Sequence, residues 1–126
     1  MKKKDDPRHK TRVQTVKLLF EKSFWENIDS QKDRQTVEII KNLSKIDRLI
    51  AKNAPAWPIN QLSPIDLATL RLAVWELLFA KQKEPYKVII DEAVEIAKEY
   101  GSEASASFIN GVLGTIVKSA PKLTKA

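Results

Sequence analysis

Apolar residues recur at helical spacing on both sides of Gly101, and this pattern constrains the fold more than any other feature of the sequence. In the stretch from Pro85 to Tyr100 the apolar positions repeat every three to four residues. A second stripe follows the glycine: Phe108, Ile109, Val112, Leu113 and Ile116. Gly101 stands where a residue in the left-handed conformation commonly ends a helix. The sequence therefore predicts two helices with a left-handed glycine between them.

The N-terminal half shows the same period. We expect a first helix over about residues 7–25, capped by Asp6, and a second over about residues 33–52. Asp47 and Arg48 fall on the polar side of the second helix, so both should face solvent. Each helix would bury one apolar face and expose the other.

A loop with two prolines separates these helices from the centre of the sequence. It covers residues 53–62 and surrounds Trp57, which we expect to anchor the loop on the core. A third helix should begin after Ser63, which can cap it, with Pro64 at its first position. Apolar residues nearly surround this helix up to about Ala80, as is typical of a central, buried helix.

No window alternates apolar and polar residues convincingly with a period of two, so a sheet is not expected. The predicted fold class is all-α, a compact bundle of about five to seven helices. The last helix should end near Lys118. Gly111 in its interior costs about 1 kcal/mol relative to alanine. We therefore expect another helix to approach Gly111 closely, with its neighbour Asn110 partly buried.

The composition limits the classes of protein. A chain of 126 residues has the length of one domain, so we treat residues 1–126 as a single helical domain. The absence of cysteine excludes disulfides and thiolate metal sites. No apolar run is long enough for a membrane span, and no signal-peptide core follows the basic N-terminus. We expect a cytoplasmic protein with no membrane association.

Positive charge is concentrated at the two ends of a chain whose net charge is +6. We expect a flexible basic arm over residues 1–7 and a basic tail over residues 119–126. A polyanion held by such ends explains the pattern, and so does a solubilising tail. Arg8, Lys10 and Arg12 favour the polyanion because they lead directly into an amphipathic helix, where their charges can neutralise phosphates.

The polar side chains do not form an active site. Asp91, Glu92, Glu95 and Glu99 share a face of one helix, and a solvated acidic face explains them better than acid–base catalysis. His9 is the only histidine, and it lacks partners for metal binding, so a nucleic-acid contact or a surface position is expected. The sequence therefore predicts a protein that is not an enzyme, with no cofactor and no metal.

Four segments in order resemble the NusB family, small helical RNA-binding factors of transcription antitermination. The most specific is the FINGVL run at 108–113, and PYKVIIDEAVEIAK at 85–98 matches a second family pattern. The basic start RHKTRVQTVKLLF at 8–20 and the segment 54–78 resemble its first helix, tryptophan loop and central helix. The region 21–53 is shorter than is usual in the family, so one helical element should be shortened or lost.

The resemblance implies two surfaces. RNA would contact the start of the first helix and the start of the last: Arg8, Lys10, Arg12, Ser105 and Phe108. Phe108 could stack on an unpaired base or pack in the core. The small-subunit ribosomal protein NusE would contact Phe20 and Asp66. The alternatives are core packing for Phe20 and stabilisation of a helix start for Asp66.

By the same resemblance, the chain would be an antitermination adaptor. It would bind boxA-like single-stranded RNA together with NusE, associate indirectly with the RNA polymerase elongation complex, and support transcription of ribosomal RNA. One alternative is the NusB-like RNA-binding part of a ribosomal RNA cytosine methyltransferase, although the sequence leaves no length for the catalytic domain. The other is a protein-only interaction bundle.

Overall fold

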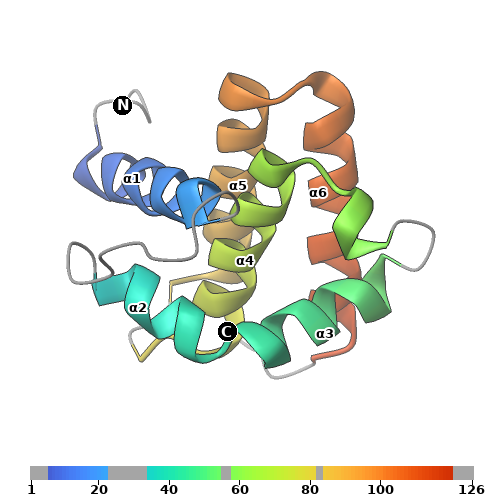
Figure 1. Ribbon diagram of the computed structural model, residues 1–126. Helices are drawn as coiled ribbons and strands as arrows, with labels where there is room; N and C mark the ends of the chain where they lie inside the picture. Colours follow the sequence, from blue (N-terminus) through green and yellow to red (C-terminus); the bar gives the residue numbers. More distant parts are fainter. Residues whose placement is uncertain (1–5, 23–33, 55–57, 82–83, 121–126) are drawn as a thin grey trace.

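The computed structural model describes residues 6–22, 34–54, 58–81 and 84–120. Within these ranges the secondary structure is entirely helical, which confirms the predicted all-α class (Figure 1). The elements are α1 (Pro7–Lys22), α2 (Arg34–Lys41), α3 (Leu43–Asn53), the 3-10 helix η3 (Ile59–Gln61), α4 (Pro64–Leu78), α5 (Tyr86–Tyr100) and α6 (Glu103–Lys118). The predicted basic arm up to Asp5, the predicted anchor Trp57 and the tail beyond Ala120 lie outside the described residues.

Helix α4 is the centre of the bundle, as predicted, and α1, α3, α5 and α6 all pack against it (Figure 1). Leu70 and Val74 are completely buried, and the buried positions of α4 lie on all its sides. The hydroxyl of Ser63 caps the helix by accepting a hydrogen bond from the Asp66 N–H at 3.2 Å. The apolar composition of α4 therefore decides its central position, and Ser63 decides where it begins.

Helices α5 and α6 share the most extensive contact of any two described helices, but Gly101 does not connect them in the predicted way. Its φ and ψ are −118° and −117°, so the predicted left-handed conformation is wrong. A Cβ at Gly101 would lie 2.8 Å from both the Ala97 carbonyl oxygen and the Ser105 Oγ. Glycine is required here because the first turn of α6 leaves no room for a side chain.

The predicted single helix over residues 33–52 is also wrong, because it breaks at Asn42 into α2 and α3. The Asn42 side chain donates to the Glu38 carbonyl oxygen at 2.8 Å, which competes with continuation of the helix. The break turns the two pieces so that each buries its own apolar residues. Asp47, predicted to face solvent, instead forms two 2.9 Å bonds with Arg71 of α4.

Two expectations for α6 are wrong as well. Asn110 is exposed, and a Cβ added at Gly111 would meet nothing within 4 Å. No helix therefore approaches this part of α6 closely enough to require a glycine. Among the residues that the structure describes, no helix is both long enough and apolar enough to cross a membrane.

Candidate nucleic-acid interface

The first two turns of α1 divide their charged residues between solvent and the bundle. Arg8 and Lys10 are exposed, whereas His9 and Arg12 are only 2% and 4% exposed. Asp6 caps the helix, accepting from the Arg8 N–H at 2.8 Å. Consecutive helical residues point about 100° apart, so a run of basic residues cannot face one ligand together.

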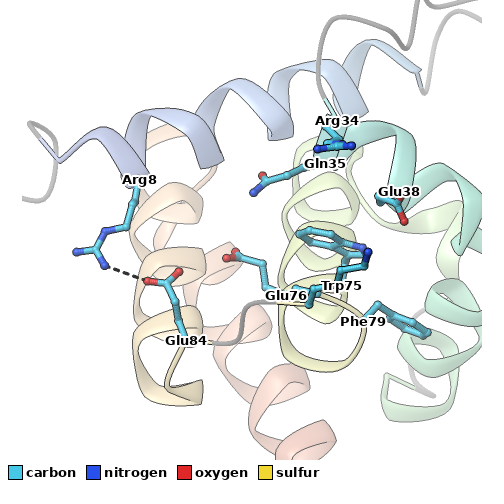
Figure 2. Close-up of a pocket in the computed structure, with 10 residues that line it drawn as sticks. Arg8, Arg34, Gln35, Glu38, Trp75, Glu76, Phe79 and Glu84 are labelled. Carbon is cyan, nitrogen blue, oxygen red and sulfur yellow. Dashed lines mark hydrogen bonds and ion pairs between the residues drawn. The ribbon is translucent and has the colours of Figure 1, made fainter.

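Arg12 lies in a buried cluster of three carboxylates from α4, α5 and the segment between them. Its Nε and Nη2 each lie 2.9 Å from an oxygen of Glu76, its Nη1 lies 3.3 Å from Glu92, and its Nη2 also contacts Glu84. Arg8 approaches the same Glu84 from solvent, at 3.2 Å (Figure 2). The prediction that Arg12 contacts RNA is therefore corrected, because its guanidinium is buried against three carboxylates. RNA would have to displace them to reach it.

Burial and charge act against each other in this cluster. Burial alone would lower the pKa of Arg12, but the hydrogen bond and charge of Glu76, helped by Glu84 and Glu92, outweigh it and raise that pKa. For Glu76 the loss of solvent is the larger effect, so its pKa is raised despite the contact with Arg12. The cluster thus keeps Arg12 charged and fixes α1 to α4 and α5.

His9 adds a second buried contact between α1 and α5. Its Nδ1 lies 2.8 Å from Glu92 Oε2, and its Nε2 lies 3.4 Å from Glu99 Oε1. The expectation of a surface histidine is therefore wrong, and so is the expectation of a fully solvated acidic face on α5. Glu92 is only 7% exposed because the basic side of α1 covers it. None of the described His, Asp and Glu residues form a group of three suited to holding a metal ion.

The outward side of α1 carries cations that remain accessible. Lys10, Gln14 and Lys17 follow each other at spacings of four and three residues, and all three are exposed. We call this side the α1 basic face. The Lys17 ammonium lies 5.8 Å from the ring centroid of Tyr100, which is 46% exposed at the end of α5. An exposed aromatic ring beside a lysine is the combination that binds an unpaired base next to a phosphate.

The sequence pattern does not distinguish Lys17 or Tyr100 as ligand-binding residues. Tyr100 was assigned to the apolar stripe of α5, and Lys17 had no neighbour in the sequence to distinguish it. The available signal was the position of Tyr100 directly before Gly101, where the helix ends and a ring can project past its last turn. Only the crossing of α1 over α5 shows that the two residues are adjacent.

At the start of α6 the predicted RNA and partner residues touch each other. Ser105 donates to Asp66 Oδ2 at 3.1 Å, although the two residues were assigned to different ligands. Oδ1 of Asp66 is buried and has no hydrogen-bond partner in the described part of the chain. Phe108 and Phe20 are both half-buried and pack against the core, which leaves part of each ring accessible.

The structure does not gather the predicted RNA residues at one point. Arg8 is bound to Glu84, which follows α4 and shares Arg12 with Glu76 of its last turn, whereas Ser105 is bound to the first turn of α4. Asp66 and Glu76 mark those two turns and are about 15 Å apart along the helix axis. Tyr100 lies next to the turn that begins α6, and Lys17 connects it to α1. The α1 basic face and Tyr100 therefore connect the two parts of the predicted RNA surface, the part at Arg8 and the part at Ser105.

Comparisons with known proteins agree with this architecture. The model of the NusB family matches residues 9–118. The transcription antitermination protein NusB of Chloroflexus aggregans is 40% identical over 129 residues, covering 87% of this chain and 86% of that protein. A solved structure of T. maritima NusB has a TM-score of 0.80 at 40% identity and covers 90% of this chain and 92% of the other.

A second similar structure contains the antitermination factors NusB and NusE in complex with double-stranded RNA. It has a TM-score of 0.77 and covers 89% of this chain and 96% of the matched chain. At 24% identity this similarity shows the shared fold alone.

Proposed function

The chain belongs to the NusB family, and on that premise we propose that it is an RNA-binding adaptor of transcription antitermination. It would bind boxA-like single-stranded RNA together with the ribosomal protein NusE. Through that complex it would act on elongating RNA polymerase in the cytoplasm and support transcription of ribosomal RNA. The observation that carries the proposal is the division of α1, where buried His9 and Arg12 hold Lys10 and Lys17 outward.

The RNA surface that we propose differs from the one expected from the sequence. Lys10 and Lys17 would neutralise phosphates, and the Tyr100 ring would stack on an unpaired base. Arg8 and the accessible part of Phe108 would extend the surface toward the two ends of α4. Arg12 and His9 would orient α1 without touching RNA.

The NusE surface would include Asp66 and Phe20. The half-buried carboxylate of Asp66 carries a negative charge that can attract a cationic side chain of a basic ribosomal protein. No turnover is proposed for this chain. The carboxylates best placed for catalysis, Glu76 and Glu92, are already bound to Arg12 and His9.

The experiment is a titration with labelled RNA, with and without NusE. Three RNAs are compared: single-stranded boxA, a scrambled strand of the same length, and a duplex, since the more distant NusB and NusE complex contains double-stranded RNA. We expect boxA to bind best and NusE to increase its affinity. Tight NusE binding with no gain in RNA affinity would favour the protein-only bundle.

Two variants locate the RNA surface. Tyr100→Leu should weaken single-stranded binding by about tenfold through lost stacking, while the fold is kept because the ring is half-exposed. Val88→Ala on the same helix is the matched control, since Val88 is similarly exposed but carries no ring that could stack on a base. Equal losses in the two variants would place the RNA elsewhere.

A further inference from the structure

A groove of about 710 Å³ opens between the start of α1, α2 and the end of α4 (Figure 2). Its wall on α4 is aromatic, formed by Trp75 and by Phe79 just beyond the end of that helix, four residues later. Trp75 is 9% exposed, and Phe79 is half-buried. In Figure 2, Arg34, Gln35 and Glu38 of α2 lie across the groove from these rings. Its volume is in the range of sites that hold a ligand the size of a nucleotide.

Each acid that lines the groove lies near a cation. Glu76 and Glu84 are bound to Arg12, and Glu38 lies 4.0 Å from Lys41. Two cations that line the groove, Arg34 and Lys81, have no ion-pair partner among the described residues. The three cations and three acids that line the groove balance in formal charge, so attraction of an anionic ligand would come from Arg34 and Lys81, whose charges no described residue engages.

Arg8 connects this groove to the proposed RNA surface, because it lines the groove and follows directly on the start of α1. We infer that the groove binds one unpaired nucleobase of the same RNA strand. The base would stack on the half-buried Phe79, beside the small exposed part of Trp75, and Arg34 and Lys81 would contact the flanking phosphates. This inference rests on the proposed function. It extends the proposed RNA surface from α1 past Arg8 into the groove.

The chemistry of the groove fits a base better than a protein side chain. Unpaired bases bind where an aromatic ring stacks on their face, polar groups meet their edge and cations hold their phosphates. The groove offers all three, since the exposed Glu38 can accept a hydrogen bond from the amino group of a base. For a basic partner, the acids of the groove are already engaged by cations of this chain. An acidic peptide would pair with Arg34 and Lys81 but would leave the aromatic rings without a stacking partner.

The test measures binding of labelled single-stranded boxA RNA to the full chain and to variants. Phe79→Leu removes the ring but keeps an apolar side chain, and we expect it to weaken binding by about tenfold. Phe79→Tyr keeps a ring and should bind as the native protein does. Arg34→Ala should reduce the slope of log affinity against log salt by about 0.7. Lys45→Ala, an exposed lysine of α3 away from the groove, is the control and should leave the slope closer to its native value.

A scan with abasic RNA tests the same contact without changing the protein. Replacing one particular base by an abasic site should weaken binding to the native protein by about tenfold, and Phe79→Leu should show no further loss at that position. If RNA binds the native protein but its affinity is unchanged by Phe79→Leu, by Arg34→Ala and by every abasic site, the groove does not bind a base. That result would overturn the inference and leave the proposed function intact. A loss of NusE affinity in place of RNA affinity would assign the groove to protein and overturn the inference. Failure of the native protein to bind RNA would end both proposals.

Discussion

Ser105 of α6 donates a hydrogen bond to Asp66 of α4, with 3.1 Å between Oγ and Oδ2. The two residues occupy equivalent positions in their helices. Each donates its backbone N–H to the capping serine three residues earlier, Ser63 for Asp66 and Ser102 for Ser105. One side-chain contact thus joins the first turns of α4 and α6, and in the proposed function it also joins the NusE surface to the RNA surface.

Ser105→Ala should therefore reduce the coupling between the two ligands. The change leaves Asp66 without its hydrogen-bond donor, which should lower the free energy of unfolding by about 1 kcal/mol. We also expect a smaller ratio of RNA affinities measured with and without NusE. Ser107→Ala is the control, because Ser107 is exposed on the same helix. An unchanged ratio in Ser105→Ala would show that the contact is only structural.

Replacement of glycine by alanine should lower the stability of the protein at Gly101 and raise it at Gly111. Gly101→Ala places a Cβ 2.8 Å from backbone oxygen and from Ser105, so it should lower the free energy of unfolding by about 2 kcal/mol. Gly111→Ala fills open space within α6 and should raise it by about 1 kcal/mol. Urea unfolding followed by circular dichroism measures both. A stabilising Gly101→Ala would mean that the turn relaxes freely.

Two cations of α1 should separate stability from RNA binding. Arg12→Ala leaves buried Glu76 and Glu92 without their guanidinium and should cost about 3 kcal/mol of unfolding free energy. Lys10→Ala, at an exposed position, should change stability by less than about 0.5 kcal/mol. Lys10→Ala should instead reduce the slope of log RNA affinity against log salt concentration by about 0.7. If Arg12→Ala instead keeps its stability and reduces the salt dependence of RNA affinity, Arg12 contacts RNA after all.

The raised pKa of Glu76 predicts a pH dependence of stability. Burial raises this pKa in the folded protein above its usual 4.5, so the folded state binds the proton more tightly than the unfolded state. The resulting stabilisation is complete below the unfolded pKa and is lost as the pH rises through the folded one. Relative to Glu76→Gln, the native protein should therefore lose stability as the pH increases above about 4.5. A difference between the two proteins that is constant with pH would contradict this.

Periodicity in the sequence was sufficient for the class of fold and for most of the helices. The apolar residues of α4 predicted its central position, and Ser63 and Asp6 marked where α4 and α1 begin. The break at Asn42 was missed, because local propensity cannot show that two apolar stripes must turn toward different neighbours. Gly101 was correctly placed at a helix end for the wrong reason, since the constraint is the close approach of the Ala97 carbonyl oxygen and of Ser105, and not a left-handed backbone.

The candidate site was less predictable than the fold. Arg8, His9, Lys10 and Arg12 look alike in a basic run, yet helical geometry turns two of them into a buried acidic cluster and leaves two in solvent. Nothing in the sequence pairs Arg12 with Glu76, Glu84 and Glu92, which lie 64 to 80 residues further along the chain. Of these acids, Glu92 belongs to the face predicted to be solvated, because its partners His9 and Arg12 are on another helix.

The sequence by itself determined that this chain forms helices, where most of them begin, and which family it resembles, since these properties depend on neighbours along the chain. Tertiary structure alone decided which charges remain available. A cation becomes a ligand contact or a buried ion pair according to the helix that crosses it, and that crossing is set by core packing between residues far apart in sequence. Lys17 beside Tyr100 and Arg12 beside Glu76 are the two outcomes of this one cause.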